Sequence, residues 1–492
     1  MQKTDSKNVK GDIKNGLVYF LPLVFQNILP FVTFPIFTRL LSPEEYGLLG
    51  LGIIYATFMT GISNFGMTLA FERNYFQYRF EGKKLSQLLF SSIFFVHANF
   101  FLMLIITYLF LEPFSIFILG SLDNKWLLVG IFVALFYYNT INQFYFIYFR
   151  NKENSGQFSK YNIILSILYF VFSMFLVVVL RIGVWGIIVA EFAAGFILFV
   201  VLGIKFIQQL GFSLNKEIIL ESLKLSYPLT PRIFLGVLSA QFNKYMIGLL
   251  STIGNVGIYH IAQKIANLSF TLMSALQNVY NPEVYKKMFD DKPGVGKEIG
   301  KYLTPSLYLS ILIPLTISFF SQELLFVLAP KNYSDAIPVI MILSMYYGIL
   351  YFSKIVGIQL VFKKKTFITS LLSIVGLALN VGINIPLIKN FGVMGAAWGT
   401  FISGAISVSI SSYISRRYYK IDWELKKVIS IISIFILGNL AILFLYLTNQ
   451  EYLWCLFAKL IIFSGYLLLG ARYNIVTWYN IVMIKESILN RK

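Results

Sequence analysis

Seven polar residues recur on one helical face between Val256 and Tyr280, a stretch otherwise apolar enough to cross a membrane. At 100° per residue they fall within an arc of about 100°. They are His260, Gln263, Lys264, Asn267, Thr271, Ser274 and Asn278. Such a face cannot meet lipid cheaply, so it faces either a water-filled cavity or other helices. A packed polar seam seldom needs a cation, and Lys264 therefore favours the cavity.

Further basic residues inside apolar stretches indicate the same chemistry: Arg232, Lys244 and Lys354. Lys244 and Lys354 could instead extend toward a membrane interface along their aliphatic stems. Glu191 is the only well-buried acid that the sequence offers, so it cannot neutralise all these cations. With His260 and Lys264 they predict a cationic cavity that binds an anionic substrate.

A second set of side chains has a neutral, hydrogen-bonding character. The stretch YYNTINQFYFIYFR places Asn139, Asn142 and Gln143 at i, i+3 and i+4, with Tyr145 and Tyr148 nearby. Amides can bind sugar hydroxyls and tyrosine rings can stack on sugars. Hydrogen bonds between neighbouring helices are an equally good explanation for any one of these residues.

The elements that position these residues are transmembrane helices. The chain has 492 residues, of which 57% are hydrophobic and 13% charged, and its mean hydropathy is +0.73. These values predict an all-α polytopic membrane protein with 14 transmembrane helices. The predicted segments are 16–38, 47–70, 87–111, 126–149, 160–180, 184–205, 225–250, 256–280, 303–328, 336–361, 367–388, 393–415, 427–447 and 453–472.

The basic residues predict the orientation. About thirty of the 41 Lys and Arg residues lie in segments on the side of the N-terminus. The opposite loops hold only Arg39, Lys125, Arg181, Lys331 and Lys389. The positive-inside rule then places both termini in the cytoplasm. Lys459 and Arg472 lie near segment ends, where we expect them to extend to the interface.

An internal repeat with an offset of about 209 residues divides the chain. RLLSPEEYGLLGL from Arg39 resembles GLLSTIGNVGIYHIA from Gly248, and IGVWGIIVAEFAAGFI from Ile182 resembles FGVMGAAWGTFISGAI from Phe391. We therefore expect two six-helix lobes, 1–209 and 210–420, related by a pseudo-two-fold axis along the membrane normal. Two additional helices and a cytoplasmic tail follow in 421–492.

The repeat also relates the polar residues of the two lobes. At an offset of 210, Asn267, Ser274 and Asn278 match Thr57, Asn64 and Thr68. The cations of the stripe have no such match, because His260 and Lys264 correspond to Gly50 and Ile54. The predicted cavity is therefore polar on both lobes and cationic mainly on the second.

The helix pattern, the 6+6+2 repeat, the LLSPEEYG turn and NFGMTLAFERNYFQYR at Asn64–Arg79 resemble the Wzx-type polysaccharide flippases. These belong to the multidrug/oligosaccharidyl-lipid/polysaccharide exporter superfamily. The resemblance implies a monomer in the bacterial plasma membrane that flips undecaprenyl-diphosphate-linked oligosaccharide by alternating access. It also implies membrane lipids, a polysaccharide polymerase and a chain-length regulator as partners. Surface polymers such as capsule and O-antigen are the implied products.

Ion coupling is a further implication of the resemblance, and Glu191 is the candidate proton or sodium site. A structural ion pair would explain Glu191 equally well. The chain has only two histidines, His97 and His260, and one cysteine, so no cofactor or metal site is expected. The basic residues lie in loops between apolar segments, which favours membrane orientation over nucleic-acid binding.

Three alternatives to a polysaccharide flippase remain open at this point. A lipid II flippase of the same superfamily would use the same chemistry on a different sugar. A cation-coupled drug antiporter usually has twelve helices and binds cationic substrates, which the predicted cationic lobe disfavours. A membrane-embedded polymerase or transferase would need a catalytic loop or acidic motif, and the short outer loops hold few candidates, so no enzyme is predicted.

Overall fold

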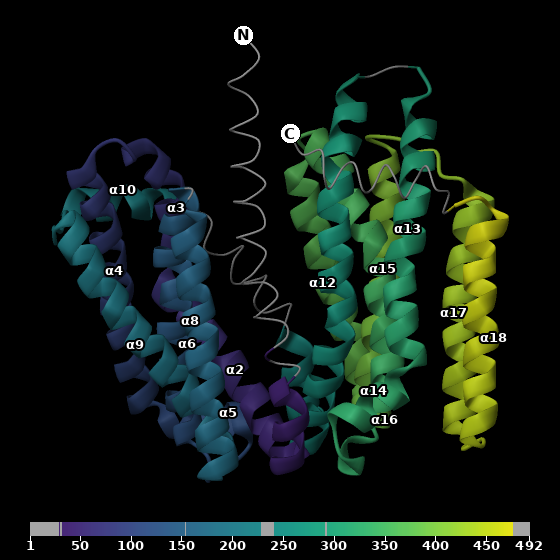
Figure 1. The fold of residues 1–492 in the computed structure, drawn as a ribbon, viewed down its shortest axis with the longest axis horizontal. Helices are drawn as coiled ribbons and strands as arrows, with labels where there is room; N and C mark the ends of the chain where they lie inside the picture. The colour runs from purple at the N-terminus through teal and green to yellow at the C-terminus, as the bar shows by residue number, and fades with distance from the viewer. Residues whose placement is uncertain (1–28, 30–31, 153, 228–240, 291–292, 476–492) are drawn as a thin grey trace. The chain divides into compact units, whose positions relative to one another are not determined.

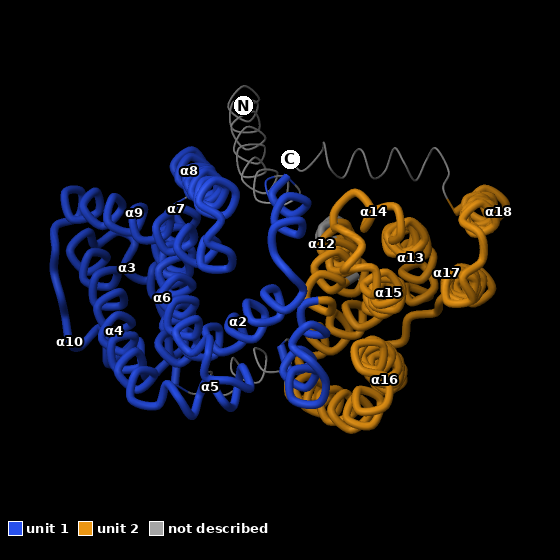
Figure 2. Tube along the Cα trace, turned by 90° about the horizontal axis from the view of Figure 1, so that it is seen from below, with its two compact units in different colours: residues 1–257 blue, residues 258–492 orange. Residues whose placement is uncertain are grey.

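The computed structural model describes residues 29, 32–152, 154–227, 241–290 and 293–475, and the regular structure of these ranges is helical. Two compact units, residues 1–257 and 258–492, are distinguished by their internal packing (Figure 2). These units follow spatial packing, whereas the predicted domain boundaries follow the sequence repeat, so the boundaries stay a prediction. The fold class, an all-α polytopic membrane protein, is confirmed.

Nine α-helices with the following bounds lie in the described part of the first unit. They are α2 (Pro43–Asn64), α3 (Met67–Tyr78), α4 (Gly82–Leu109), α5 (Leu111–Leu119), α6 (Trp126–Thr140), α7 (Phe146–Asn151), α8 (Ser155–Ser173), α9 (Val184–Leu210) and α10 (Lys216–Ser226). The π-helical turn Ile141–Tyr145 joins α6 to α7, and a second π-helical turn, Met174–Val179, extends α8. Residues 241–250 are also helical and precede α12.

Local chemistry explains the start of α2. The Ser42 hydroxyl accepts a hydrogen bond from the Glu45 amide at 3.2 Å, and the Glu45 carboxylate accepts one from the Ser42 amide at 2.9 Å. This reciprocal pair satisfies two amides that the first helical turn leaves free, and Pro43 begins the helix with a compatible φ. The SPEE stretch therefore ends the predicted outer turn and begins the second span.

The centre of the first unit is aromatic. The rings of Phe100 on α4 and Phe136 on α6 stack with centroids 3.8 Å apart, and both side chains are buried. On α9, Gly195 lies where a β-carbon would meet the backbone of Tyr137 and Tyr138 on α6. The close approach of α6 and α9 explains the glycine, because any side chain there would separate the two helices.

The helix α10 closes one end of the first unit against α3 and α4 (Figure 1). Asn74 of α3 donates a hydrogen bond to Ser222, and the Tyr78 hydroxyl donates one to Glu221 at 2.6 Å. Burial, together with the hydrogen bond to Glu221, raises the pKa of Tyr78 to about 12. Tyr78 therefore stays protonated, and remains a donor, across the physiological pH range.

The second unit contains most of α12 and all the helices that follow it. They are α12 (Ile253–Asp290), α13 (Val295–Phe319), α14 (Ser321–Leu328), α15 (Ala336–Phe362), α16 (Thr366–Arg416), α17 (Leu425–Leu447) and α18 (Tyr452–Arg472). The helix α15 is central, because it packs against α13, α16 and α17. The rings of Tyr308 on α13 and Tyr466 on α18 stack at 4.7 Å, and each hydroxyl donates to the other residue's carbonyl oxygen.

Ten described helices are long and apolar enough to cross a membrane, when a helix and its continuation through a π-helical turn are counted together. One of them, α16, covers the predicted segments 367–388 and 393–415, which meet at the non-helical Gly392. The helix α12 covers segment 256–280 but carries the polar stripe and is not among the ten. Segments 16–38 and 225–250 lie partly outside the described residues, so the count of 14 stays a prediction.

Two elements differ from their predicted ranges. The second predicted span, 47–70, is interrupted, because Phe65 and Gly66 have left-handed backbones with φ of 50° and 74°. The ninth, 303–328, ends at Phe319, and its last part forms the separate short helix α14. Polar residues mark both breaks, Ser63 and Asn64 at the first and Ser321, Gln322 and Glu323 at the second, but each stretch is apolar enough as a whole to be predicted as one span.

The internal repeat is visible in matched backbone conformations. Gly183 has φ 61° and ψ −141°, and its counterpart Gly392 has φ 55° and ψ −130°. Residues with a side chain are essentially excluded from this region, so both copies need glycine at this turn. The next matched pair is equally constrained, because a β-carbon at Gly186 or Gly395 would meet the backbone of the preceding helix.

The starts of α2 and α12 cross at a pair of glycines within the first unit. A β-carbon at Gly47 would overlap the Ile253 carbonyl oxygen, and one at Gly257 would overlap the Pro43 carbonyl oxygen. Because the two contacts are reciprocal, we refer to them as the glycine crossing. The match of Gly47 with Gly257 in the repeat therefore corresponds to a mutual contact.

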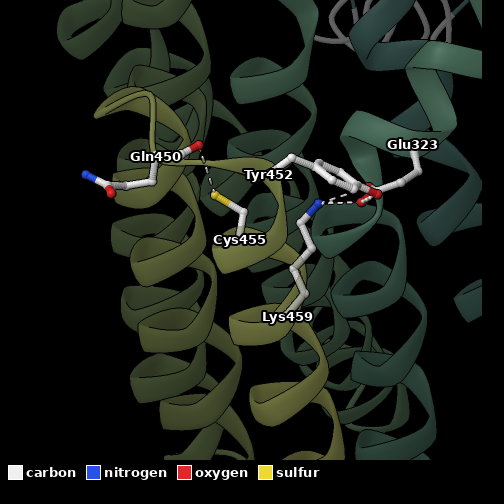
Figure 3. Close-up of polar contacts among 5 residues, drawn as sticks. All are labelled: Glu323, Gln450, Tyr452, Cys455 and Lys459. Atoms are coloured by element: carbon white, nitrogen blue, oxygen red, sulfur yellow. Dashed lines mark hydrogen bonds and ion pairs between the residues drawn. The ribbon is translucent and has the colours of Figure 1, made fainter.

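Lys459 was expected to extend to the interface, and this expectation is wrong. The side chain is 1% exposed, and its Nζ lies 2.8 Å from a carboxylate oxygen of Glu323 on α14. The Tyr452 hydroxyl donates to the same carboxylate at 3.1 Å (Figure 3). A buried lysine so close to a carboxylate is held by charge pairing, because removal from water without a partner would cost several kcal/mol.

Candidate functional site

The polar stripe of α12 forms an open face of the second unit. Lys264, Asn267 and Thr271 are exposed, and His260, Gln263 and Ser274 are partly buried. The opposite face is packed, because Ile261, Ala262 and Ile265 are at most 3% exposed. The side chain of Asn278 lies outside the described residues. The structure therefore exposes three of the seven predicted stripe residues, Lys264, Asn267 and Thr271, and buries part of three others.

The central helix α15 adds a second cation beside this face. The Nζ of Lys354 lies 4.6 Å from the centroid of the Phe270 ring on α12, a distance typical of a cation–π contact. Tyr347 of α15 has its ring 6.1 Å from Phe270 and its side chain hydrogen-bonded to Gln263. These contacts bring together two residues predicted from the sequence, Gln263 and Lys354, and two that were not, Phe270 and Tyr347.

The charge on this part of the second unit is positive. The helix α15 contains no acidic residue, and α12 contains none before Glu283. Phe270 follows Lys264 by six positions, about 9 Å along the helix axis. Lys264 and Phe270, over which Lys354 lies, therefore both belong to the part of α12 that precedes its first acidic residue.

The remaining predicted cations lie elsewhere. Lys244 is 6% exposed and its Nζ donates to Gln241 at 3.3 Å, so its side chain is buried rather than extended to an interface. Lys244 belongs to the first compact unit and α12 beyond Gly257 to the second. Arg232 lies outside the described residues. That Lys244 and Arg232 bind an anionic substrate stays a prediction.

The neutral polar residues of the first unit form a compact hydrogen-bonded cluster. Asn64 Nδ2 donates to Thr68 Oγ1 and to Gln143 Oε1, both at 2.7 Å, and Asn64 Oδ1 accepts from the Thr68 amide at 3.2 Å. Asn64 ends α2, Thr68 lies in the first turn of α3, and Gln143 lies in the π-helical turn Ile141–Tyr145. We call these three residues the amide cluster.

The other predicted neutral residues do not join the amide cluster. Asn142 donates to the Tyr138 carbonyl oxygen at 2.9 Å, and Thr57 donates to the Ile53 carbonyl oxygen at 2.6 Å. Both bonds lie within one helical element and satisfy the side chain locally. Asn139 is partly buried.

Glu191 lies on α9 in the first unit and is partly exposed. Its carboxylate interacts electrostatically with the hydroxyl groups of Tyr138 on α6 and Tyr169 on α8. Sequence reasoning did not find these two tyrosines, because their spacing relative to Glu191 is set only by helix packing. In the described ranges no three His, Cys, Asp or Glu side chains gather closely enough to hold a metal ion.

Comparisons with known proteins agree with this architecture. Residues 13–286 match the model of a family described as polysaccharide biosynthesis protein. The chain is also 25% identical over 186 residues to a probable low-salt glycan biosynthesis flippase, Agl15, of Haloferax volcanii. That alignment covers 36% of this chain and 39% of the Haloferax protein.

Two solved structures share the fold. A lipid II flippase, MurJ, in an inward closed conformation has a TM-score of 0.67 at 19% identity, with 93% of this chain and 98% of that chain covered. An inward-facing multidrug resistance transporter of the MATE family, within the MOP superfamily, has a TM-score of 0.61 at 14% identity. The second likeness covers 81% of this chain and 97% of that chain.

Proposed function

The chain belongs to the polysaccharide biosynthesis protein family, and from this membership we propose that it is a flippase for undecaprenyl-diphosphate-linked oligosaccharide repeat units. In this proposal it moves them from the cytoplasmic to the outer leaflet of the bacterial plasma membrane by alternating access, for surface polysaccharide biosynthesis. It is a transporter and not an enzyme.

The observation that carries the proposal is the cationic face formed by α12 and α15. Lys264 of α12 and Lys354 of α15 are both exposed, and Lys354 lies over the Phe270 ring of α12. A diphosphate carries at least two negative charges, and two ammonium groups can each bind one phosphate. A cationic drug would be repelled from the same face, which disfavours a drug antiporter despite the shared fold.

Export of surface polysaccharide tests the proposal. Lys264→Ala and Lys354→Ala should each reduce export at least tenfold, because a charge-assisted contact contributes about 1.5–3 kcal/mol. Lys389→Ala is a matched control, since Lys389 is an exposed lysine of α16 in the same unit. Membrane levels of the three variants should equal those of the unmodified protein. Normal export by both α12–α15 variants would refute the cationic-face assignment.

A lipid II flippase is the second candidate, favoured by the fold likeness to MurJ. The two functions differ in the sugar and not in the diphosphate. An assay of the reconstituted protein distinguishes the two functions. Both lipid II and the host's own lipid-linked oligosaccharide are supplied, and the lipid that crosses the bilayer identifies the substrate. For the energy source, the partly exposed Glu191 with its two tyrosine neighbours is the candidate proton or sodium site.

A further inference from the structure

Two irregularities of the helical backbone meet at the amide cluster. The first is the break between α2 and α3, where Phe65 and Gly66 are left-handed. The second is the π-helical turn Ile141–Tyr145, which interrupts the span Trp126–Asn151. Gln143 lies about 12 Å from the Asn151 end of that span at 1.5 Å per residue. The π-helical turn therefore lies inside an apolar span, and the 2.7 Å hydrogen bond from Asn64 to Gln143 brings the break between α2 and α3 beside it.

Such backbone is costly in a membrane and needs a reason. A left-handed phenylalanine costs on the order of 1 kcal/mol or more, and π-helical turns occur frequently at functional sites. Irregular backbone at membrane depth is tolerated where it is buried in protein or lines a water-filled cavity. Gln143 and Thr68 are partly exposed, so the side chains at this junction are not sealed inside the helices.

The hydrogen bonds within the amide cluster determine which of its polar groups remain available to a ligand. Asn64 is 8% exposed and uses its donor and acceptor atoms inside the cluster. Gln143 accepts through Oε1, so its Nε2 with two N–H groups points away from Asn64. Thr68 Oγ1 also accepts from Asn64, which leaves its own O–H to donate. Within the described ranges, neither Gln143 Nε2 nor the Thr68 hydroxyl donates a hydrogen bond to another protein atom.

The surroundings are aromatic and electrically neutral. The ring of Phe65, next to Asn64 in the chain, lies 6.0 Å from that of Tyr227, which is 67% exposed. The nearest charges along α3 and α7, Glu72 and Arg150, pair with each other at 2.7 Å. Neutral donors beside aromatic rings suit the hydroxyl groups and C–H faces of a sugar and lack the cation that a phosphate needs.

We propose that the amide cluster is a sugar-binding subsite of the first unit. Gln143 Nε2 and Thr68 Oγ1 donate hydrogen bonds to sugar hydroxyl groups, and Asn64 is a positioning residue that orients both donors. This inference rests on the proposed function and extends it, because it assigns recognition of the glycan part of the substrate to α3 and the π-helical turn of the first unit.

Binding measurements on the full-length protein in nanodiscs test the inference. The two probes are undecaprenyl diphosphate and the undecaprenyl-diphosphate-linked oligosaccharides extracted from the host's own membranes. Gln143→Met should weaken binding of the sugar-bearing lipid by about 3- to 10-fold, the value of one neutral hydrogen bond. It should leave binding of undecaprenyl diphosphate unchanged. Asn142→Met, in the same turn, should change neither affinity, because Asn142 bonds to its own helix.

The role of Asn64 is tested by Asn64→Ser, whose hydroxyl can still cap α3 at the Thr68 amide but cannot reach Gln143. It should reproduce the sugar-selective loss of Gln143→Met with a thermal unfolding midpoint close to that of the unmodified protein. Equal losses for both lipids in either variant would overturn the subsite. If the unmodified protein bound neither lipid, the proposed function would be overturned as well. If only Lys264→Ala lost its affinity for both lipids, the proposed function would stand.

Discussion

Two lysines of the second unit are accommodated in opposite ways. Lys459 is buried against the carboxylate of Glu323, whereas Lys354 is exposed and lies over the Phe270 ring. The first arrangement fixes the lysine in place, and the second leaves its ammonium available to a ligand. Sequence alone does not separate the two cases, because Glu323 is 136 positions from Lys459 and only the fold brings them together.

The Phe270 contact leads to a prediction about Lys354. Phe270→Leu removes the ring that holds the ammonium, and an exposed cation–π contact contributes about 0.5–1 kcal/mol. Affinity for undecaprenyl diphosphate should therefore fall about two- to fivefold, while Phe270→Tyr, which keeps an aromatic face, should retain it. Isothermal titration in detergent checks both variants. Unchanged affinity in Phe270→Leu would show that the ring does not position Lys354.

At the scale of elements, hydropathy predicts where helices cross the membrane and periodicity predicts the open face of α12. Neither predicts the break at Phe65 and Gly66. The equivalent helix of the second copy, α12, has no such break and runs from Ile253 to Asp290. Side-chain hydrogen bonds stabilise the break, because Asn64 accepts one from the Thr68 amide in the first turn of α3 and donates one to Gln143. Such partners come from another part of the chain and leave no local signal.

The helix α16 offers a prediction with its own internal control. Gly392 has φ 55° and ψ −130°, where a side chain is strained, whereas a β-carbon at Gly382 would meet no atom within 4 Å. Gly392→Ala should destabilise the protein by about 1–3 kcal/mol. Gly382→Ala should be neutral or stabilise by about 0.5–1 kcal/mol, because alanine favours helix more than glycine does. Thermal unfolding in detergent measures both, and equal midpoints would contradict the assigned turn.

At the scale of the whole molecule, the all-α membrane fold and the family follow from the sequence, whereas the count of 14 helices and the domain boundaries stay predictions. Orientation in the membrane rests on the distribution of Lys and Arg, which the fold by itself does not test. The assignment of substrate contacts to one unit or the other could not be derived from sequence, because it depends on which side chains become buried. Lys244 and Lys264 show this, since the first is 6% exposed and the second is on the open face.

Thiol labelling tests the predicted orientation. The chain has a single cysteine, Cys455, so Cys455→Ser gives a background without thiols. In it, Lys331→Cys should react with a membrane-impermeant maleimide in intact cells, because Lys331 is predicted outside. Lys216→Cys on α10 should react only after permeabilisation. Both side chains are exposed, so access through the protein does not limit either reaction. The reverse pattern would invert the topology.

The glycine crossing has the form of an isologous contact. In a two-fold homodimer, residue i of one subunit meets residue j of the other and j meets i. Gly47 with Ile253 and Gly257 with Pro43 stand in this relation, although both pairs belong to one chain. A single-repeat ancestor with this contact would have been a self-complementary dimer, in which every substitution appears twice. In a single chain the two sides can differ, as His260 and Lys264 differ from Gly50 and Ile54, while the two glycines keep the reciprocal contact.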